Sequence, residues 1–179
     1  MTKNLNTFRI PRSNFLQLTS ITIFLAFFLF PSNINAQAKA NFGGTWAFNE
    51  SKSNVGDAGG FRRPSKQITV KQEGNNLNVD RLGTNRDGEE TTISSKYTLD
   101  GKECSNTRSM GGNEIIMKSI LTWSADGKAL TIATTTDFNG NVRKSSEAWK
   151  LTDAKTLSIV STTNRDGQEV KSTLVYDKK

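Results

Sequence analysis

Closely spaced hairpin turns constrain this chain more than any other feature of its sequence. Asn-Gly, Asp-Gly and related groups recur at short, even intervals after Ser65. Glycine and asparagine accept the positive φ that a tight hairpin turn requires. The turn groups are Glu73–Asn76, Asn85–Gly88, Asp100–Lys102, Gly111–Asn113, Asp126–Lys128, Asn139–Asn141, Thr152–Lys155 and Asn164–Gly167. The spacing therefore predicts a series of hairpins.

The segments between these turns have the character of β-strands. They are rich in Thr, Val, Ile and aromatic residues, and many alternate apolar with polar positions. No helical periodicity follows Ser65, and Glu50–Pro64 is the only long connection. The sequence thus predicts an all-β fold, an up-and-down antiparallel β-barrel of eight to ten strands, closed so that no sheet edge is exposed.

The first 36 residues have the layout of a secretory signal peptide. Three basic residues precede an apolar run, Ile21–Phe30, and polar residues then lead to Asn35–Ala38. The run is shorter than the ~20 apolar residues that span a membrane, which disfavours a retained helix. Cleavage after Ala36 or Ala38 is expected, so that residues 37–179 form one exported domain, periplasmic or extracellular. No cysteine follows the run to accept a lipid anchor.

Composition excludes several classes of function. The chain carries a formal charge of +7 and no histidine, which rules out histidine-based catalytic triads and imidazole metal sites. We expect no metal, no cofactor and no catalytic residues. Lys and Arg are scattered rather than massed, so we expect no nucleic-acid partner. Polar outward positions such as Lys71 and Lys96 disfavour an outer-membrane barrel. Cys104, the only cysteine, is either a small buried residue or a reactive thiol, and its neighbours favour the first.

The two ends of the chain carry a family resemblance. Phe42-Gly43-Gly44-Thr45-Trp46, the long first connection, the hairpin series and the final Leu174-Val175-Tyr176-Asp177-Lys178 resemble the calycin superfamily, above all bacterial lipocalin-like domains. The resemblance implies a non-enzymatic binder of small hydrophobic molecules, with a ligand opening at the rim that carries the long first connection. Leu174 stands where fatty-acid-binding proteins place an arginine. Lys178 and Lys179 stand where lipocalins stack an arginine over the tryptophan.

Alternation assigns each predicted strand an inward set of side chains. At the end of the barrel away from that rim, the inward sets are aromatic and apolar. We expect this barrel floor to contain Trp46, Tyr97, Trp123, Trp149 and Tyr176.

Nearer the rim, the same inward sets become basic and hydroxyl-bearing. The predicted ligand-binding residues are Arg81, Arg108, Met117, Thr134, Arg143 and Ser172. A buried arginine without a partner costs several kcal/mol. Each of the three arginines must therefore reach water, a carboxylate such as Glu147, or a ligand anion, unless a shift in register turns it to solvent.

The sequence therefore predicts an exported, non-enzymatic carrier of a small lipophilic or amphiphilic molecule held in the barrel, and the inward arginines would suit an anionic one. The alternative is an adaptor module that binds a protein or glycan through its loops or outer face. An interior smaller than about 300 Å³ would favour that alternative. An enzyme is the third possibility, and activity on lipid-like esters would reveal it.

Overall fold

The computed structural model describes residues 38–56, 64–85, 87–110, 112–138, 140–165 and 168–179. They belong to one compact unit, Gln37–Lys179. The predicted signal peptide, residues 1–36, lies outside the described residues. Within the described ranges, no helix is long and apolar enough to cross a membrane. The ten strands are β1 (Gly44–Phe48), β2 (Gln67–Glu73), β3 (Asn76–Thr84), β4 (Glu90–Thr98), β5 (Glu103–Met110), β6 (Asn113–Trp123), β7 (Ala129–Phe138), β8 (Asn141–Asp153), β9 (Thr156–Arg165) and β10 (Gln168–Lys178).

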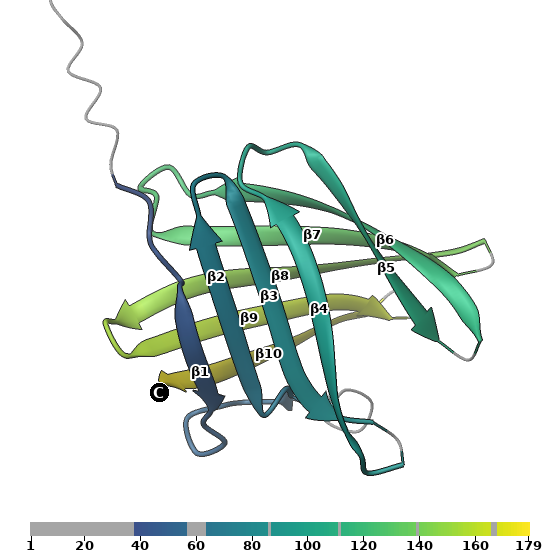
Figure 1. Cartoon of the computed structure of the whole chain (residues 1–179), viewed down its shortest axis with the longest axis horizontal. Helices are drawn as coiled ribbons and strands as arrows, with labels where there is room; N and C mark the ends of the chain where they lie inside the picture. The colour runs from purple at the N-terminus through teal and green to yellow at the C-terminus, as the bar shows by residue number, and fades with distance from the viewer. Residues whose placement is uncertain (1–37, 57–63, 86, 111, 139, 166–167) are drawn as a thin grey trace, which may run out of the picture. The chain divides into compact units, whose positions relative to one another are not determined.

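All ten strands form one antiparallel sheet in the order β4-β3-β2-β1-β10-β9-β8-β7-β6-β5. Consecutive strands pair as hairpins, and the first strand pairs with the last, Phe48 lying opposite Tyr176. In Figure 1, β1–β4 form a front layer and β7–β10 cross behind it at a steep angle. The predicted all-β, up-and-down antiparallel barrel is therefore confirmed.

The barrel is nearly closed, and β4 and β5 are its two edge strands. A side chain joins them where a backbone ladder would otherwise run. Asn106 of β5 accepts a hydrogen bond from the Lys96 backbone N at 2.7 Å and donates one to the Lys96 carbonyl at 3.0 Å. A carboxamide has one donor group and one acceptor, so it satisfies the same two backbone groups that a neighbouring strand would pair. The sequence predicted complete closure, and this join replaces the last ladder.

Glycines in the hairpin turns adopt positive φ angles. Gly74 has φ 55° in the β2–β3 turn, and Gly127 has φ 65° in the β6–β7 turn. Both values lie in the left-handed region, which glycine enters without steric cost. The hairpin spacing read from the sequence is thus the spacing of the strands.

The core lies between the two layers and follows the predicted alternation. In β3 the even positions Asn76 and Asn78 are exposed while Leu77 and Val79 are buried. In β7 the buried positions are Leu130 and Ile132. Each such side chain contributes about 1.5–3 kcal/mol when fully buried. The buried hydrophobic cluster comprises Phe42, Trp46, Ile68, Val70, Leu77, Val79, Leu99, Leu121, Leu130, Ile132, Trp149, Leu157, Ile159 and Tyr176.

Candidate functional site

One end of the interior is closed by aromatic rings that gather around Phe42. The Phe42 ring stacks on Trp123 at a centroid distance of 5.9 Å and meets Trp149 edge-on at 5.8 Å. The indole N–H of Trp46 donates to the Phe42 carbonyl at 2.9 Å. The structure thus brings all three tryptophans of the chain together, although β1, β6 and β8 are far apart in sequence. We call Phe42, Trp46, Trp123 and Trp149 the aromatic end.

Phe42 reaches this position because polar contacts hold the segment before β1. The Phe42 backbone N donates to the side-chain carbonyl of Gln72 at 2.9 Å, and the Gln72 amide donates to the Ala40 carbonyl at 3.0 Å. The Ala40 N donates to the Gly127 carbonyl in the β6–β7 turn at 2.9 Å. The segment is therefore fixed to both β2 and the β6–β7 turn, and it places the Phe42 ring against the tryptophans of the aromatic end.

Gly44 and Lys178 explain the Gly-x-Trp motif physically. The Lys178 Nζ lies 5.2 Å from the centre of the Trp46 ring, within the range of a cation–π interaction. Gly44 has φ 139°, and a Cβ there would lie 2.9 Å from the Lys178 Cε. The glycine therefore leaves room for the lysine stem. Lys178 thus takes the place over the tryptophan for which the resemblance implies an arginine.

An ion pair crosses the middle of the interior, which we call the lumen. The Arg81 Nη2 of β3 lies 2.6 Å from the Glu147 Oε2 of β8, so the pair joins the front layer to the back layer. Their side chains are only 16% and 24% exposed. The Trp149 indole N–H donates to the same Glu147 oxygen at 3.0 Å. The guanidinium carbon of Arg81 lies 5.5 Å from the centre of the Trp149 ring. The central pair, Arg81 and Glu147, therefore rests directly on the aromatic end.

Burial and charge perturb the groups around the central pair. Burial, the largest single influence, would lower the pKa of Arg81, but the Glu147 charge and hydrogen bond together with Tyr97 and Tyr176 outweigh it, so the pKa is raised. Burial raises the pKa of Tyr97 and of Tyr176, and the charges of Arg81 and Glu147 both act on each hydroxyl. Residues of β3, β4, β8 and β10 thus converge on one polar region within the lumen.

The hydroxyl of Tyr176 is a buried polar group in this region. Tyr176 is completely buried, and its hydroxyl has no hydrogen-bond partner among the described residues. A buried polar group without a partner costs roughly 1–3 kcal/mol. By contrast, Tyr97 is only half-buried and is hydrogen-bonded to Ser95. The Tyr176 hydroxyl therefore bears this cost in this structure.

Beyond the central pair, the inward positions carry small hydroxyl side chains. Strand register places Ser145 opposite Thr134 and Thr163, and Ser172 opposite Ser161. These side chains are partly exposed, whereas the residues of the aromatic end are mostly inaccessible. The Ser119 and Thr134 hydroxyl oxygens lie 2.9 Å apart. We call this set the hydroxyl row; its members are Thr134, Thr136, Ser145, Ser161, Thr163 and Ser172.

The predicted ligand-binding residues fall into three environments. Arg81 is held by Glu147, one of the partners that the sequence offered for it. Arg108 and Met117 are partly buried on the inward rows of β5 and β6. Arg143 lies on the inward row of β8, opposite Thr136, but its side chain is exposed. The remaining two, Thr134 and Ser172, belong to the hydroxyl row.

The predicted floor residues divide in a similar way. Trp46, Trp123 and Trp149 lie at the aromatic end, as described above. Tyr97 and Tyr176 lie within the influence of the charges of the central pair, and Tyr176 also belongs to the buried cluster that contains Trp46 and Trp149. The aromatic and basic zones therefore meet in mid-lumen, where the sequence placed them at separate ends.

Cys104 is partly buried, and its thiol donates to the Ser119 carbonyl at 3.3 Å. Among the described residues, no group of three His, Cys, Asp or Glu side chains is placed to hold a metal ion.

Sequence reasoning missed two features. Phe42 precedes the first strand, so no alternation pattern assigns it to the interior.

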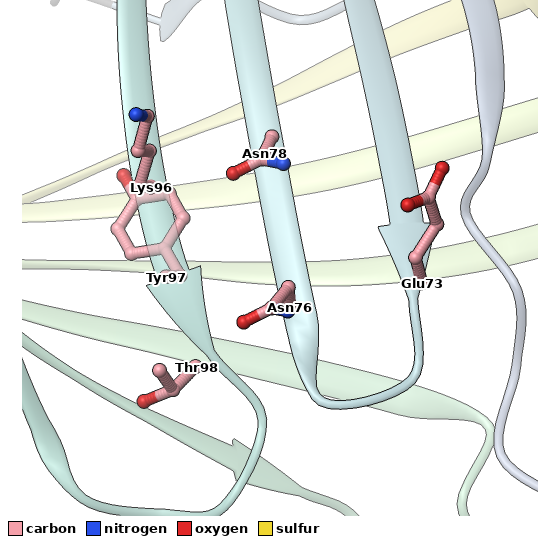
Figure 2. Close-up of a pocket in the computed structure, with 6 residues that line it drawn as sticks. All are labelled: Glu73, Asn76, Asn78, Lys96, Tyr97 and Thr98. Carbon is pink, nitrogen blue, oxygen red and sulfur yellow. The ribbon is translucent and has the colours of Figure 1, made fainter.

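The second feature is a surface hollow of about 360 Å³ on the outer face of β2–β4 (Figure 2). Its lining residues are Glu73, Asn76, Asn78, Lys96, Tyr97 and Thr98. In Figure 2 Asn76 and Asn78 follow one another along β3, between Glu73 and the β4 residues. The one sequence signal for this hollow is that alternation places four of its residues on the outer face of the sheet, namely Asn76, Asn78, Lys96 and Thr98.

Comparisons with known proteins find similarity to a solved structure but no match in sequence. No protein-family model matches the chain, and no curated protein matches it. Among solved structures, the chain is similar to zebrafish ileal bile acid-binding protein in complex with cholic acid. The two share 14% identity with a TM-score of 0.49, and the match covers 77% of this chain and 98% of that chain.

Proposed function

We propose that this protein is a non-enzymatic binder of a small lipophilic or amphiphilic molecule, which enters the lumen past the hydroxyl row. The hydrophobic part of the molecule packs against Met117 and the apolar side chains around it. Its polar part reaches the central pair. Binding sites of this kind combine an apolar lining with a few placed polar groups that fix orientation.

One observation carries this proposal, namely the change in burial along the lumen. The aromatic end is filled by large rings, and Trp46 and Trp149 are completely buried. The hydroxyl row consists of small side chains that stay partly exposed. A barrel that needed its interior only for stability would gain about 0.8 kcal/mol for each further buried methylene group. Small polar side chains on inward positions forgo that gain, which supports a role for this end of the lumen other than stability.

Native mass spectrometry of protein purified from its own host tests the proposal. We expect a co-purified small molecule that organic solvent removes. The stripped protein should then bind Nile red, an uncharged lipophilic dye, with a rise in dye fluorescence. Protein that carries no small molecule and does not bind the dye would contradict the proposal.

A matched pair of substitutions assigns the dye to the lumen. Ser172→Phe fills the hydroxyl row, whereas Thr131→Phe adds the same ring to an exposed position on the outside of β7. We expect Ser172→Phe to weaken Nile red binding by about tenfold or more, since the ring occupies the space that the dye needs. Thr131→Phe should bind the dye as the wild type does. Equal effects from both variants would place the dye elsewhere.

The outer hollow supports a second candidate function, binding of a polar partner such as a glycan. The amides of Asn76 and Asn78 and the ammonium group of Lys96 are exposed and lie close together there. Asn78→Ala combined with Lys96→Ala would abolish binding in a glycan array under this reading, and leave Nile red binding unchanged.

We also propose that the protein acts outside the cytoplasm after loss of residues 1–36. The basic start and short apolar run of this segment support export. Amino-terminal sequencing of protein isolated from its host should begin at Gln37 or Lys39. A mature chain that still begins at Met1 would contradict export by this route.

A further inference from the structure

The position that a ligand carboxylate would take beside Arg81 is already filled by the protein. The Glu147 Oε2 lies 2.6 Å from the Arg81 Nη2 and also accepts from the Trp149 indole at 3.0 Å. Both contacts come from groups that are themselves largely buried. The guanidinium and the carboxylate neutralise one another, so the centre of the lumen carries no net charge from this pair.

From this arrangement we infer that the molecule bound in the lumen has an uncharged, hydrogen-bonding head group, such as an alcohol or a glycerol ester. The inference rests on the proposed function and specifies the ligand of that same site. An ionised head group at the central pair would place two negative charges beside one guanidinium. Charges that are removed from water and left uncompensated cost several kcal/mol.

The Tyr176 hydroxyl supplies the contact that an uncharged head group needs. It is completely buried, lacks a partner among the described residues, and lies within the electrostatic influence of both Arg81 and Glu147. A phenol hydroxyl both donates and accepts. An alcohol or ester oxygen beside it would satisfy the group without adding charge.

The other two inward-row arginines, Arg108 and Arg143, lie away from the central pair. Arg108 lies opposite Ile115, and Arg143 opposite Thr136, both toward the rim and away from the aromatic end. Arg143 is exposed, so water screens its charge. An anion attracted to these residues would sit at the rim, and substituting Glu147 would not alter its binding.

Two ligands of equal chain length test the inference. Protein stripped of lipid is titrated with 1-dodecanol and with dodecanoate at pH 8, where the acid is ionised, and displacement of Nile red is followed. We expect the wild type to bind dodecanol at least about tenfold more tightly than dodecanoate, because the carboxylate meets Glu147. Equal affinities, or tighter binding of dodecanoate, would overturn the inference.

Glu147→Gln keeps an acceptor for Trp149 but removes the negative charge, which leaves Arg81 without its anionic partner. Dodecanoate should then bind about tenfold more tightly or better, and the wild-type preference for dodecanol over dodecanoate should disappear or reverse. The control is Glu90→Gln, which removes an exposed carboxylate that pairs with Lys66 on the surface. It should change neither affinity.

The other outcomes distinguish the inference about an uncharged head group from the proposed binding function. An unchanged affinity for dodecanoate in Glu147→Gln overturns the inference and leaves the binding function standing. Failure of the wild type to bind Nile red and both ligands removes the proposed function together with the inference. If Glu147→Gln does not fold, the wild-type preference for dodecanol over dodecanoate decides alone.

Discussion

The two ends of the lumen are built from the same ten strands but in opposite ways. At the aromatic end, Phe42 and three indoles pack together, and the segment before β1 donates backbone hydrogen bonds to the Gln72 side chain and the Gly127 carbonyl. At the other end, alternation continues without interruption, yet the inward rows of β7–β10 carry mainly small serine and threonine side chains. The difference shows that an inward position alone does not decide burial, because the size of the side chains changes along the same rows.

The central pair marks the boundary between these ends. Arg81 and Glu147 come from strands on opposite layers, and both touch Trp149. Their contacts therefore join the two layers directly beside the aromatic end. The substitutions below separate the contributions of the two ends.

The largest effect is expected where the seal is removed. Phe42→Ala deletes a ring that is completely buried and contacts two tryptophans. We expect a loss of about 3–5 kcal/mol in the free energy of unfolding, measured in urea. Phe138→Ala is the matched control, because Phe138 is 37% exposed near the other end. It should cost less than about 0.5 kcal/mol. Similar losses in both variants would contradict the contrast between the ends.

Breaking the central pair should give the next largest effect. Glu147→Leu leaves a mostly buried guanidinium without its carboxylate, and we expect a loss of about 2–4 kcal/mol, reduced from full burial by the partial exposure of the pair. The double variant Arg81→Met with Glu147→Leu should recover most of that loss. Glu90→Leu, in the exposed Lys66 pair, should leave stability nearly unchanged. A double variant less stable than Glu147→Leu would contradict the predicted coupling.

A smaller effect is expected at the Gly-x-Trp motif. Gly44→Ala forces an L-residue to φ 139° and brings its Cβ to 2.9 Å from Lys178. We expect a loss of about 1–3 kcal/mol from backbone strain and the displaced lysine. Gly83→Ala is the control, since no atom outside its chain neighbours lies within 4 Å of its added Cβ. Thermal unfolding of both variants decides, and equal melting temperatures would refute the role assigned to Gly44.

The smallest effect concerns the two tyrosines, the only ones in the chain. Burial raises the pKa of both above the usual value of about 10. The folded state therefore favours the neutral phenols, so their stabilising contribution is present below pH 10 and is lost as the pH rises beyond it. Ultraviolet absorption at alkaline pH should show both phenols ionising above pH 10 in the folded protein. Normal titration of both would contradict their burial beside the central pair.

The strand arrangement was predictable because it depends on local chemistry. Asn-Gly and Asp-Gly turns set the strand boundaries, and alternation set the inward rows that contain Arg81, Glu147 and Ser172. Contacts between rows were not predictable in the same way. Alternation shows that Arg81 and Glu147 both face inward, but their meeting depends on how the two layers cross.

Phe42 and Asn106 lay beyond sequence reasoning for a different reason. Phe42 is outside any strand, and its position follows from the amide of Gln72 on a neighbouring strand. Asn106 joins β4 to β5 through its side chain, where the alternation of β5 indicates only an inward residue. Both are single side chains that substitute for backbone structure, and no periodic pattern marks such a residue.

Backbone amide chemical shifts recorded by NMR while Nile red is added are the most direct test of binding in the lumen. If the dye binds there, the shifts of Ser161, Thr163 and Ser172 in the hydroxyl row change, and those of Asn78 and Lys96 in the outer hollow do not. Shifts confined to Asn78 and Lys96, or no shifts at all, would contradict a binding site in the lumen.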